Sequence, residues 1–176
     1  PTEYVDATKS HLVEDGVISL PFGSCRIFED KTNKPTNVES EVLVTGVAYV
    51  SVPKLHMPGQ IEKAPWLSES KKNDYFKLDS VDVFSAKNFI AFINSKYKSK
   101  LSRMFIFVHG FKVDFESAAL STAQVAIDLN LDGVPMFFSW PSNVGVNNYG
   151  KAKERAEYAS YFLQQFLEMC AKSTNV

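Results

Sequence analysis

The chain has 176 residues, of which 45% are hydrophobic and 22% are charged, and its formal net charge is −1. These values are typical of a globular protein with one sizeable core, and they disfavour a disordered or membrane-embedded chain. Acidic and basic residues are mixed along the sequence, so no basic field is present that would concentrate nucleic acid, and we expect no nucleic-acid partner.

The apolar run Met104 to Val108 is far shorter than the roughly 20 residues that a membrane helix needs. The first residues show no pattern of basic, apolar and small residues such as a signal peptide has. Pro1 is not an initiator methionine, which suggests a processed or trimmed start. We therefore expect a soluble protein without a membrane span. Export with the signal already removed is compatible with this start, and the compartment stays open.

The two cysteines, Cys25 and Cys170, lie far apart in sequence and form no CxxC or CxxH pattern. Neither a zinc site nor a redox pair is indicated, and we expect no cofactor and no bound metal. Two unpaired thiols are the favoured interpretation. A single disulfide is the alternative, because the sequence does not give the distance between the two Cα atoms.

The first half of the chain is predicted to consist of loops, one short strand and two longer strands. Residues 1–41 are rich in turn formers and predict a loop-rich arm with one short strand around Cys25 to Phe28. The β-branched run at 42–52 predicts a strand that is closed by Pro53. A long loop then leads to residues 75–84, where apolar and polar residues alternate as in a second strand.

From residue 85 onward, helix and strand patterns alternate. Ser85 is a suitable N-cap for a helix that ends near the basic cluster at 96–100. Met104 to Val108 reads as a parallel strand buried on both faces. Asp114 is expected to cap the next helix, which is followed by a buried strand at 134–140. A last helix is predicted from about Lys151 to Ala171.

This order of strand, helix, strand, helix, strand, helix predicts an α/β fold with a doubly wound, mainly parallel sheet. No internal repeat and no low-complexity tract is found, and composition changes only between the loop-rich arm and the regular part of the chain. We expect a loop-rich arm over residues 1–41 and one α/β domain over residues 42–176.

Ligands bind parallel α/β sheets outside the carboxyl ends of the strands, so the loops after Val108 and Trp140 are the candidate binding loops. His109-Gly110-Phe111 directly follows a buried strand. A glycine there allows a sharp turn, after which backbone amides can point at one spot. In acyl transfer such an amide stabilises the developing oxyanion by about 3 kcal/mol. A strand end with a turn glycine is the simpler alternative.

Two segments carry a family resemblance, residues 105–118 (FIFVHGFKVDFESA) and residues 137–142 (FFSWPS). Together they resemble the domain-of-unknown-function 900 branch of the α/β-hydrolase superfamily, which is related to esterases and lipases. Residues 46–59 (GVAYVSVPKLHMPG) are similar to the sequence that precedes this domain. The resemblance covers residue 42 to the C-terminus and implies the N-terminal half of an α/β-hydrolase domain.

This resemblance implies a serine-type ester hydrolase with a Gly-x-Ser-x-Gly nucleophile elbow, followed by an acid and a histidine. No Gly-x-Ser-x-Gly motif occurs in this sequence. No catalytic residue can therefore be assigned, and the expected substrate is a small ester acted on by a longer protein. The oxyanion candidates are the backbone amides of Phe111 and Lys112, in a loop that also contains His109 and Gly110. Trp140 and Tyr149 either line an acyl pocket or pack in the core.

Other polar residues have simpler interpretations. Ser139 lies inside a strand and is expected to be a sheet residue rather than a nucleophile. His109 is expected to support its loop rather than act as a general base. His11 and His56 lie in predicted loops without a partner at ligand spacing, and we expect both to be surface histidines.

Two functions compete. The first is part of a carboxylic ester hydrolase, and the second is a non-catalytic interaction module built on half of a hydrolase fold. In the usual hydrolase order, residues 104–108 pair with the nucleophile strand, so their outer edge would be open here. We expect a second copy, another polypeptide or the N-terminal arm to cover this edge. A nucleotide-binding domain is disfavoured, because no Gly-x-Gly-x-x-Gly or P-loop motif follows any strand.

Overall fold

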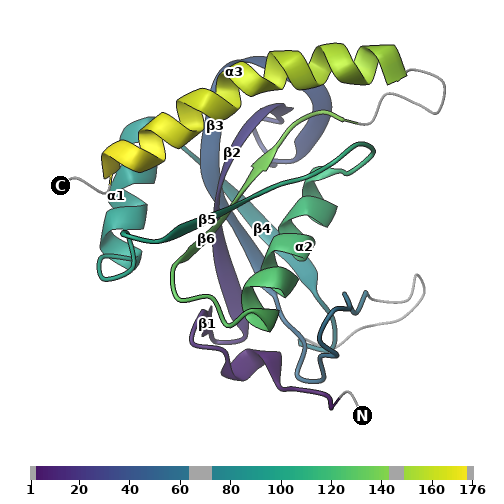
Figure 1. The fold of residues 1–176 in the computed structure, drawn as a ribbon, viewed down its shortest axis with the longest axis vertical. Coiled ribbons are helices and arrows are strands. Elements are labelled where there is room, and N and C mark those ends of the chain that lie inside the picture. Colours follow the sequence, from purple (N-terminus) through teal and green to yellow (C-terminus); the bar gives the residue numbers. More distant parts are fainter. Residues whose placement is uncertain (1–2, 64–72, 143–148, 174–176) are drawn as a thin grey trace.

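The computed structural model describes residues 3–63, 73–142 and 149–173 (Figure 1). A short 3-10 helix, Ala7–Lys9, precedes the regular elements. These follow in the order β1 (Val13–Glu14), β2 (Val17–Phe28), β3 (Pro35–Ser51), β4 (Lys77–Phe84), α1 (Ala86–Lys96), β5 (Met104–Val108), α2 (Phe115–Asp128), β6 (Val134–Ser139) and α3 (Tyr149–Ser173).

The strands form one mixed sheet in the order β4-β3-β2-β6-β5, and β1 pairs with β2 outside this path. The pairs β2–β6 and β6–β5 are parallel. The pairs β4–β3, β3–β2 and β2–β1 are antiparallel. The predicted α/β class is confirmed, and the carboxyl ends of β2, β6 and β5 meet at one edge of the sheet.

Helices cover both faces of this sheet (Figure 1). On one face, α2 packs against the sheet through an aromatic cluster in which the Phe115 ring lies 5.0 Å from that of Phe22 and 5.1 Å from that of Phe137. On the other face, α1 and α3 share a core with β6. The doubly wound arrangement is therefore confirmed. None of the helices in the described segments is long and apolar enough to cross a membrane.

The first forty residues differ from the prediction of loops with one short strand. β2 is twelve residues long and lies between β3 and β6, and β3 begins at Pro35 rather than near residue 42. Two turn formers are accommodated inside β2. Pro21 precedes residues 22–24, which pair with β6, so its missing N–H lies outside that ladder. At Gly23 an added Cβ would lie 2.5 Å from the Phe166 ring, so this glycine serves packing rather than a turn.

The elements after residue 84 agree with the prediction. The Ser85 side chain accepts a hydrogen bond from the Asn88 N–H, and Asp114 accepts one from the Ser117 N–H at 2.7 Å. β6 is buried along its whole length. β5 was predicted to be buried on both faces, but its residues are only half-buried and Val108 is 45% exposed. The reason is its position, because β5 lies at the edge of the sheet and β6 is its partner strand.

Both cysteines are free and buried, so the interpretation as two unpaired thiols is confirmed. Burial raises the pKa of each thiol to about 12. At neutral pH both are therefore protonated, and a buried thiol of this kind is chemically inert.

Candidate functional site

The loops that follow β5 and β6 lie side by side at the carboxyl edge of the sheet. Val108 pairs with Phe138, and on the other side of β6 Ser139 pairs with Ser24 of β2. The three strand ends therefore bring together the residues after Val108, the residues after Phe138 and the end of β2. We call residues 109–114 the β5–α2 loop.

His109, the first residue of this loop, is only 4% exposed and is hydrogen-bonded through both ring nitrogens. Its Nε2 accepts the backbone N–H of Trp140 at 3.1 Å and lies 3.2 Å from Ser139 Oγ. An amide can only donate, so Nε2 is unprotonated and the ring proton is on Nδ1. Nδ1–H then donates to the carbonyl oxygen of Gly110 at 2.9 Å.

This environment keeps His109 neutral. Burial lowers the pKa of its imidazole from 6.5 to about 4, although the hydrogen bond to Gly110 acts in the opposite direction. The positive charge of Arg26 lowers the pKa further. Because both nitrogens already have partners within the protein, the ring has no accessible lone pair with which to take a proton from a substrate.

The hydrogen bond to Gly110 also sets the direction of the next amide. The structure contains no cis peptide bond among the described residues. In a trans peptide the C=O and N–H groups point in opposite directions. The carbonyl of Gly110 points at His109, so the N–H of Phe111, which belongs to the same peptide, points away from the imidazole.

The turn of the β5–α2 loop is made at Lys112 and not at Gly110. Lys112 has a φ of 59°, in the left-handed region, whereas Gly110 is not among the glycines with positive φ. The expectation that the glycine makes the sharp turn is thus wrong. A Cβ added to Gly110 would meet no atom within 4 Å, so this glycine leaves open space beside the backbone. Phe111 is 37% exposed, and Lys112 Nζ lies 5.5 Å from the centre of its ring.

The far end of the loop is held at Val113. Its N–H donates to Ser142 Oγ at 3.1 Å, and the Ser142 hydroxyl donates to its carbonyl oxygen at 2.9 Å. The same carbonyl accepts a hydrogen bond from Arg26 Nη2 at 3.2 Å. The β5–α2 loop is therefore fixed at Gly110 and at Val113, on either side of Phe111 and Lys112.

Arg26 is the residue of this cluster that sequence reasoning missed. It comes from β2, is 2% exposed, and donates through Nε to Ser139 Oγ at 2.9 Å. The signal in the sequence is a single arginine within a run of apolar and small residues, but the turn formers around that run predict a loop-rich arm. Ser139 is fully buried inside β6, as expected of a sheet residue, and no substrate can reach its hydroxyl as the structure stands.

Trp140 and Tyr149 are the other residues predicted to lie near the loop. Trp140 is 8% exposed, and its indole N–H donates to the carbonyl oxygen of His109 at 3.0 Å. Tyr149 begins α3, but its side chain and residues 143–148 lie outside the described part of the chain. An acyl-pocket wall made of these two residues therefore stays a prediction.

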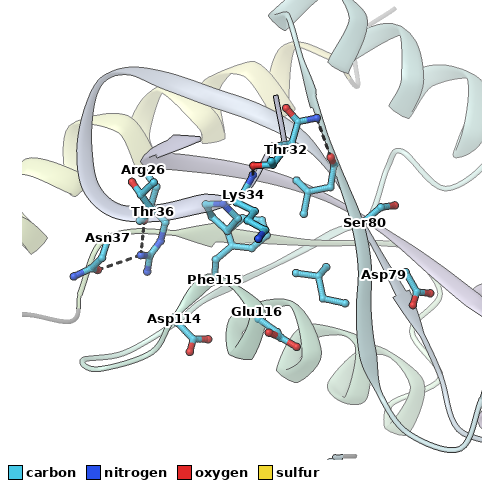
Figure 2. A pocket seen from close by; sticks show the side chains of 14 residues that line it. Arg26, Thr32, Lys34, Thr36, Asn37, Asp79, Ser80, Asp114, Phe115 and Glu116 are labelled. Carbon is cyan, nitrogen blue, oxygen red and sulfur yellow. Dashed lines mark hydrogen bonds between the residues drawn. The ribbon is translucent and has the colours of Figure 1, made fainter. Parts of the chain in front are cut away.

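A pocket of about 510 Å³ adjoins the loop on the α2 side of the sheet (Figure 2). Its walls are formed by residues 32–37, which connect β2 to β3 and begin β3, by residues 78–81 of β4, and by the first turn of α2. Its volume lies within the range of about 300 to 1,000 Å³ that is usual for small-molecule sites. Figure 2 shows Asp114 and Glu116 at the α2 wall, with Arg26 and Asn37 across from them. This pocket was not predicted from the sequence, because the β2–β3 hairpin that forms one of its walls was not predicted.

The two remaining histidines differ from each other. His11 is exposed, as predicted, but the prediction for His56 is wrong because it is fully buried. His56 Nδ1 lies 2.9 Å from Glu62 Oε2, and Nε2 lies 2.7 Å from Asp128 Oδ1. Asp128 ends α2, about 20 Å along the helix from the β5–α2 loop. This cluster ties the loop after β3 to α2 and lies apart from the candidate site.

Comparison with known proteins gives one match. Residues 85–176 match the family described as alpha/beta hydrolase of unknown function (DUF900). No curated protein and no solved structure matches the chain. The match covers α1, β5, α2, β6 and α3, including the β5–α2 loop, whereas residues 42–84 lie outside it. Because the matched residues make up more than half of the sequence, the chain belongs to this alpha/beta hydrolase family.

Proposed function

We propose that this chain supplies the oxyanion loop of a serine-type carboxylic ester hydrolase, esterase- or lipase-like, whose nucleophile, acid and catalytic histidine lie outside residues 1–176. The observation that carries the proposal is the fixed direction of the Phe111 amide. His109 holds the Gly110 carbonyl, so the Phe111 N–H is directed before any substrate arrives. Donors arranged in advance need no reorganisation when charge develops on the substrate oxygen.

In this proposal the amides of Phe111 and Lys112 stabilise the oxyanion, each by about 3 kcal/mol. Gly110 leaves room for the ester to approach the backbone, since nothing lies within 4 Å of where its Cβ would be. Trp140 and Tyr149 line the acyl side of the site. His109 supports the loop and takes no part in proton transfer, because its pKa is lowered to about 4 by burial.

A second candidate function is a non-catalytic interaction module, and the edge strand β5 favours it. The outer edge of β5 has no partner strand among the described residues, and Val108 at its end is 45% exposed. Unpaired strand edges readily add a further strand. In this reading a second copy of the chain, or another polypeptide, covers β5. The two candidates are compatible, because the strand that covers β5 could also carry the nucleophile.

The test compares this chain with the intact gene product that contains it. Both are treated with a fluorophosphonate probe for reactive serines and assayed with a short-chain ester. We expect the intact product to label and to hydrolyse ester, and this chain to do neither. Labelling of this chain alone would contradict the proposal and direct attention to Ser139 and Ser142. If neither form labels or turns over, the interaction module is the better account.

A further inference from the structure

The guanidinium of Arg26 uses all five of its N–H donors within the protein. Its acceptors lie on β3, β6, the residue after β6 and the β5–α2 loop: Ser139 Oγ at 2.9 Å from Nε, Thr36 O at 3.1 Å and Asn37 Oδ1 at 3.2 Å from Nη1, and Val113 O at 3.2 Å and Trp140 O from Nη2. Arginine has five such donors, so none remains for a bound anion. Its two contacts with the start of β3 lie on the wall of the pocket (Figure 2).

The charge of Arg26 has no carboxylate partner among the ion pairs of the described residues. All five acceptors are neutral oxygens. Burial lowers the pKa of Arg26 to about 10, which leaves it protonated at neutral pH. Removing a charged group from water is costly, and even a complete buried ion pair can often be replaced by apolar residues without loss of stability. Stability alone is therefore a poor reason for an arginine at this position.

The hydrogen bonds of Arg26 explain its presence better, because they extend to both fixed points of the β5–α2 loop, Gly110 and Val113. At one end Nη2 holds the carbonyl of Val113 directly. At the other end the contact runs through two side chains. Nε–H donates to Ser139 Oγ, and the Ser139 hydroxyl shares the lone pair of the unprotonated His109 Nε2 with the Trp140 N–H. His109 in turn holds the Gly110 carbonyl.

We infer that Arg26 is the positioning residue of the β5–α2 loop. It holds the carbonyl of Val113 directly and that of Gly110 through Ser139 and His109, and so fixes where the amides of Phe111 and Lys112 point. The role in catalysis rests on the proposed function, whereas the role in ordering the loop does not. Only a planar fork with five donors connects these segments at once. A lysine, with three donors on a single nitrogen, cannot reach Ser139, Val113 and Asn37 together.

The experiment measures amide hydrogen exchange in this chain for Arg26→Met, Arg26→Lys and the control Arg155→Met. Arg155 also lies at the carboxyl edge, where Nη1 donates to Pro141 O at 3.0 Å, but it has no described contact with the β5–α2 loop. In both Arg26 variants we expect exchange in residues 109–113 to become at least about tenfold faster, with α1 unchanged.

Three results would overturn the inference. The first is wild-type exchange in the loop of Arg26→Lys, which would mean that charge alone suffices. The second is an equal effect in Arg155→Met. The third is faster exchange throughout the sheet, which would make Arg26 an ordinary stabilising residue. If Arg26→Met does not fold, Arg26→Lys decides alone, since it retains the charge and most of the stem.

The same variants separate this inference from the proposed function. Loop exchange requires no ester turnover, so Arg26 can be shown to order the loop even if the intact product hydrolyses no ester. If the intact product is an esterase, Arg26→Lys should lower kcat by about tenfold to a hundredfold with little change in KM, because misplaced amides affect the transition state. An active esterase with unchanged kcat in Arg26→Lys would reject the role in catalysis and leave the esterase proposal intact.

Discussion

The imidazole of His109 lies parallel to the indole of Trp140, with ring centres 5.6 Å apart and ring planes 2° apart. Trp140 also donates two hydrogen bonds to His109, from its backbone N–H to Nε2 and from its indole N–H to the carbonyl oxygen. Stacking and hydrogen bonding together leave the imidazole one orientation. The first turn after β5 is thereby locked to the residue that follows β6.

Acidification should reveal the buried neutral state of His109. Its folded pKa is about 4, below the unfolded value near 6.5, so between these pH values the unfolded chain binds a proton that the folded chain does not. We expect stability to fall as the pH drops from about 6.5 to about 4, by up to about 3 kcal/mol. Denaturant unfolding measured across this range should show a larger fall in the wild type than in His109→Gln. His11→Gln, at an exposed histidine, is the control and should behave like the wild type.

Two glycine substitutions should differ in how much they change stability. A Cβ on Gly110 would meet nothing within 4 Å, so Gly110→Ala should change the free energy of unfolding by less than about 0.5 kcal/mol. A Cβ on Gly46, inside β3, would clash with the backbone oxygen of Asp82, and Gly46→Ala should cost about 1–3 kcal/mol. Chemical denaturation checks both. If Gly110→Ala destabilises as much as Gly46→Ala, the space beside Gly110 is not open. In an active intact product, Gly110→Ala should lower ester turnover without loss of stability.

The buried histidine at the other end of α2 should matter for stability and not for the candidate site. His56→Ala leaves the carboxylates of Glu62 and Asp128 without their shared donor, and breaking a buried pair in this way costs about 3–5 kcal/mol. His11→Ala removes an exposed histidine that also has two hydrogen-bond partners, Asn130 and Leu131, and should cost less than about 1 kcal/mol. Urea unfolding compares the two. A similar loss of stability in His56→Ala and His11→Ala would show that the buried position of His56 does not increase its contribution to stability.

The edge strand β5 gives a prediction about self-association. If a second copy of the chain covers this edge, the wild type should associate with increasing concentration. A charge at the exposed end of the strand, in Val108→Lys, should prevent it. Val42→Lys, at an exposed position on β3, is the matched control. Sedimentation velocity over micromolar concentrations would measure this. A wild type that stays monomeric throughout would reject a second copy as the partner of β5.

The second half of the fold could be predicted because local signals there agree with the packing. Ser85 and Asp114 act as N-caps, and the apolar runs at 104–108 and 134–139 each form a strand. The turn at Asp15-Gly16 also forms, with φ values of 50° and 78° between the paired residues Glu14 and Val17. In all these cases the residues that decide the conformation are close neighbours in sequence.

β2 and the Arg26 contacts could not be predicted, because their cause lies far away in the chain. In the sequence Pro21 and Gly23 resemble loop residues. Only the structure shows that β6 and Phe166 lie beside them. In the sequence Arg26 resembles a surface residue, because some of its acceptors lie more than a hundred residues later in the chain. The loop itself was located from its position after a strand, whereas the residue that makes its turn, Lys112, carried no signal in the sequence.

The place of β2 in the sheet also limits how far the chain can be shortened. A fragment of residues 85–176, the part matched by the family, would keep β5 and β6 but would remove the strand that covers the inner edge of β6. β2 covers residues 137–139 of β6, and the fragment would also lack every donor of Arg26. We therefore expect a fragment of residues 85–176 to be less stable than a chain that also contains β2, from Val17 onward.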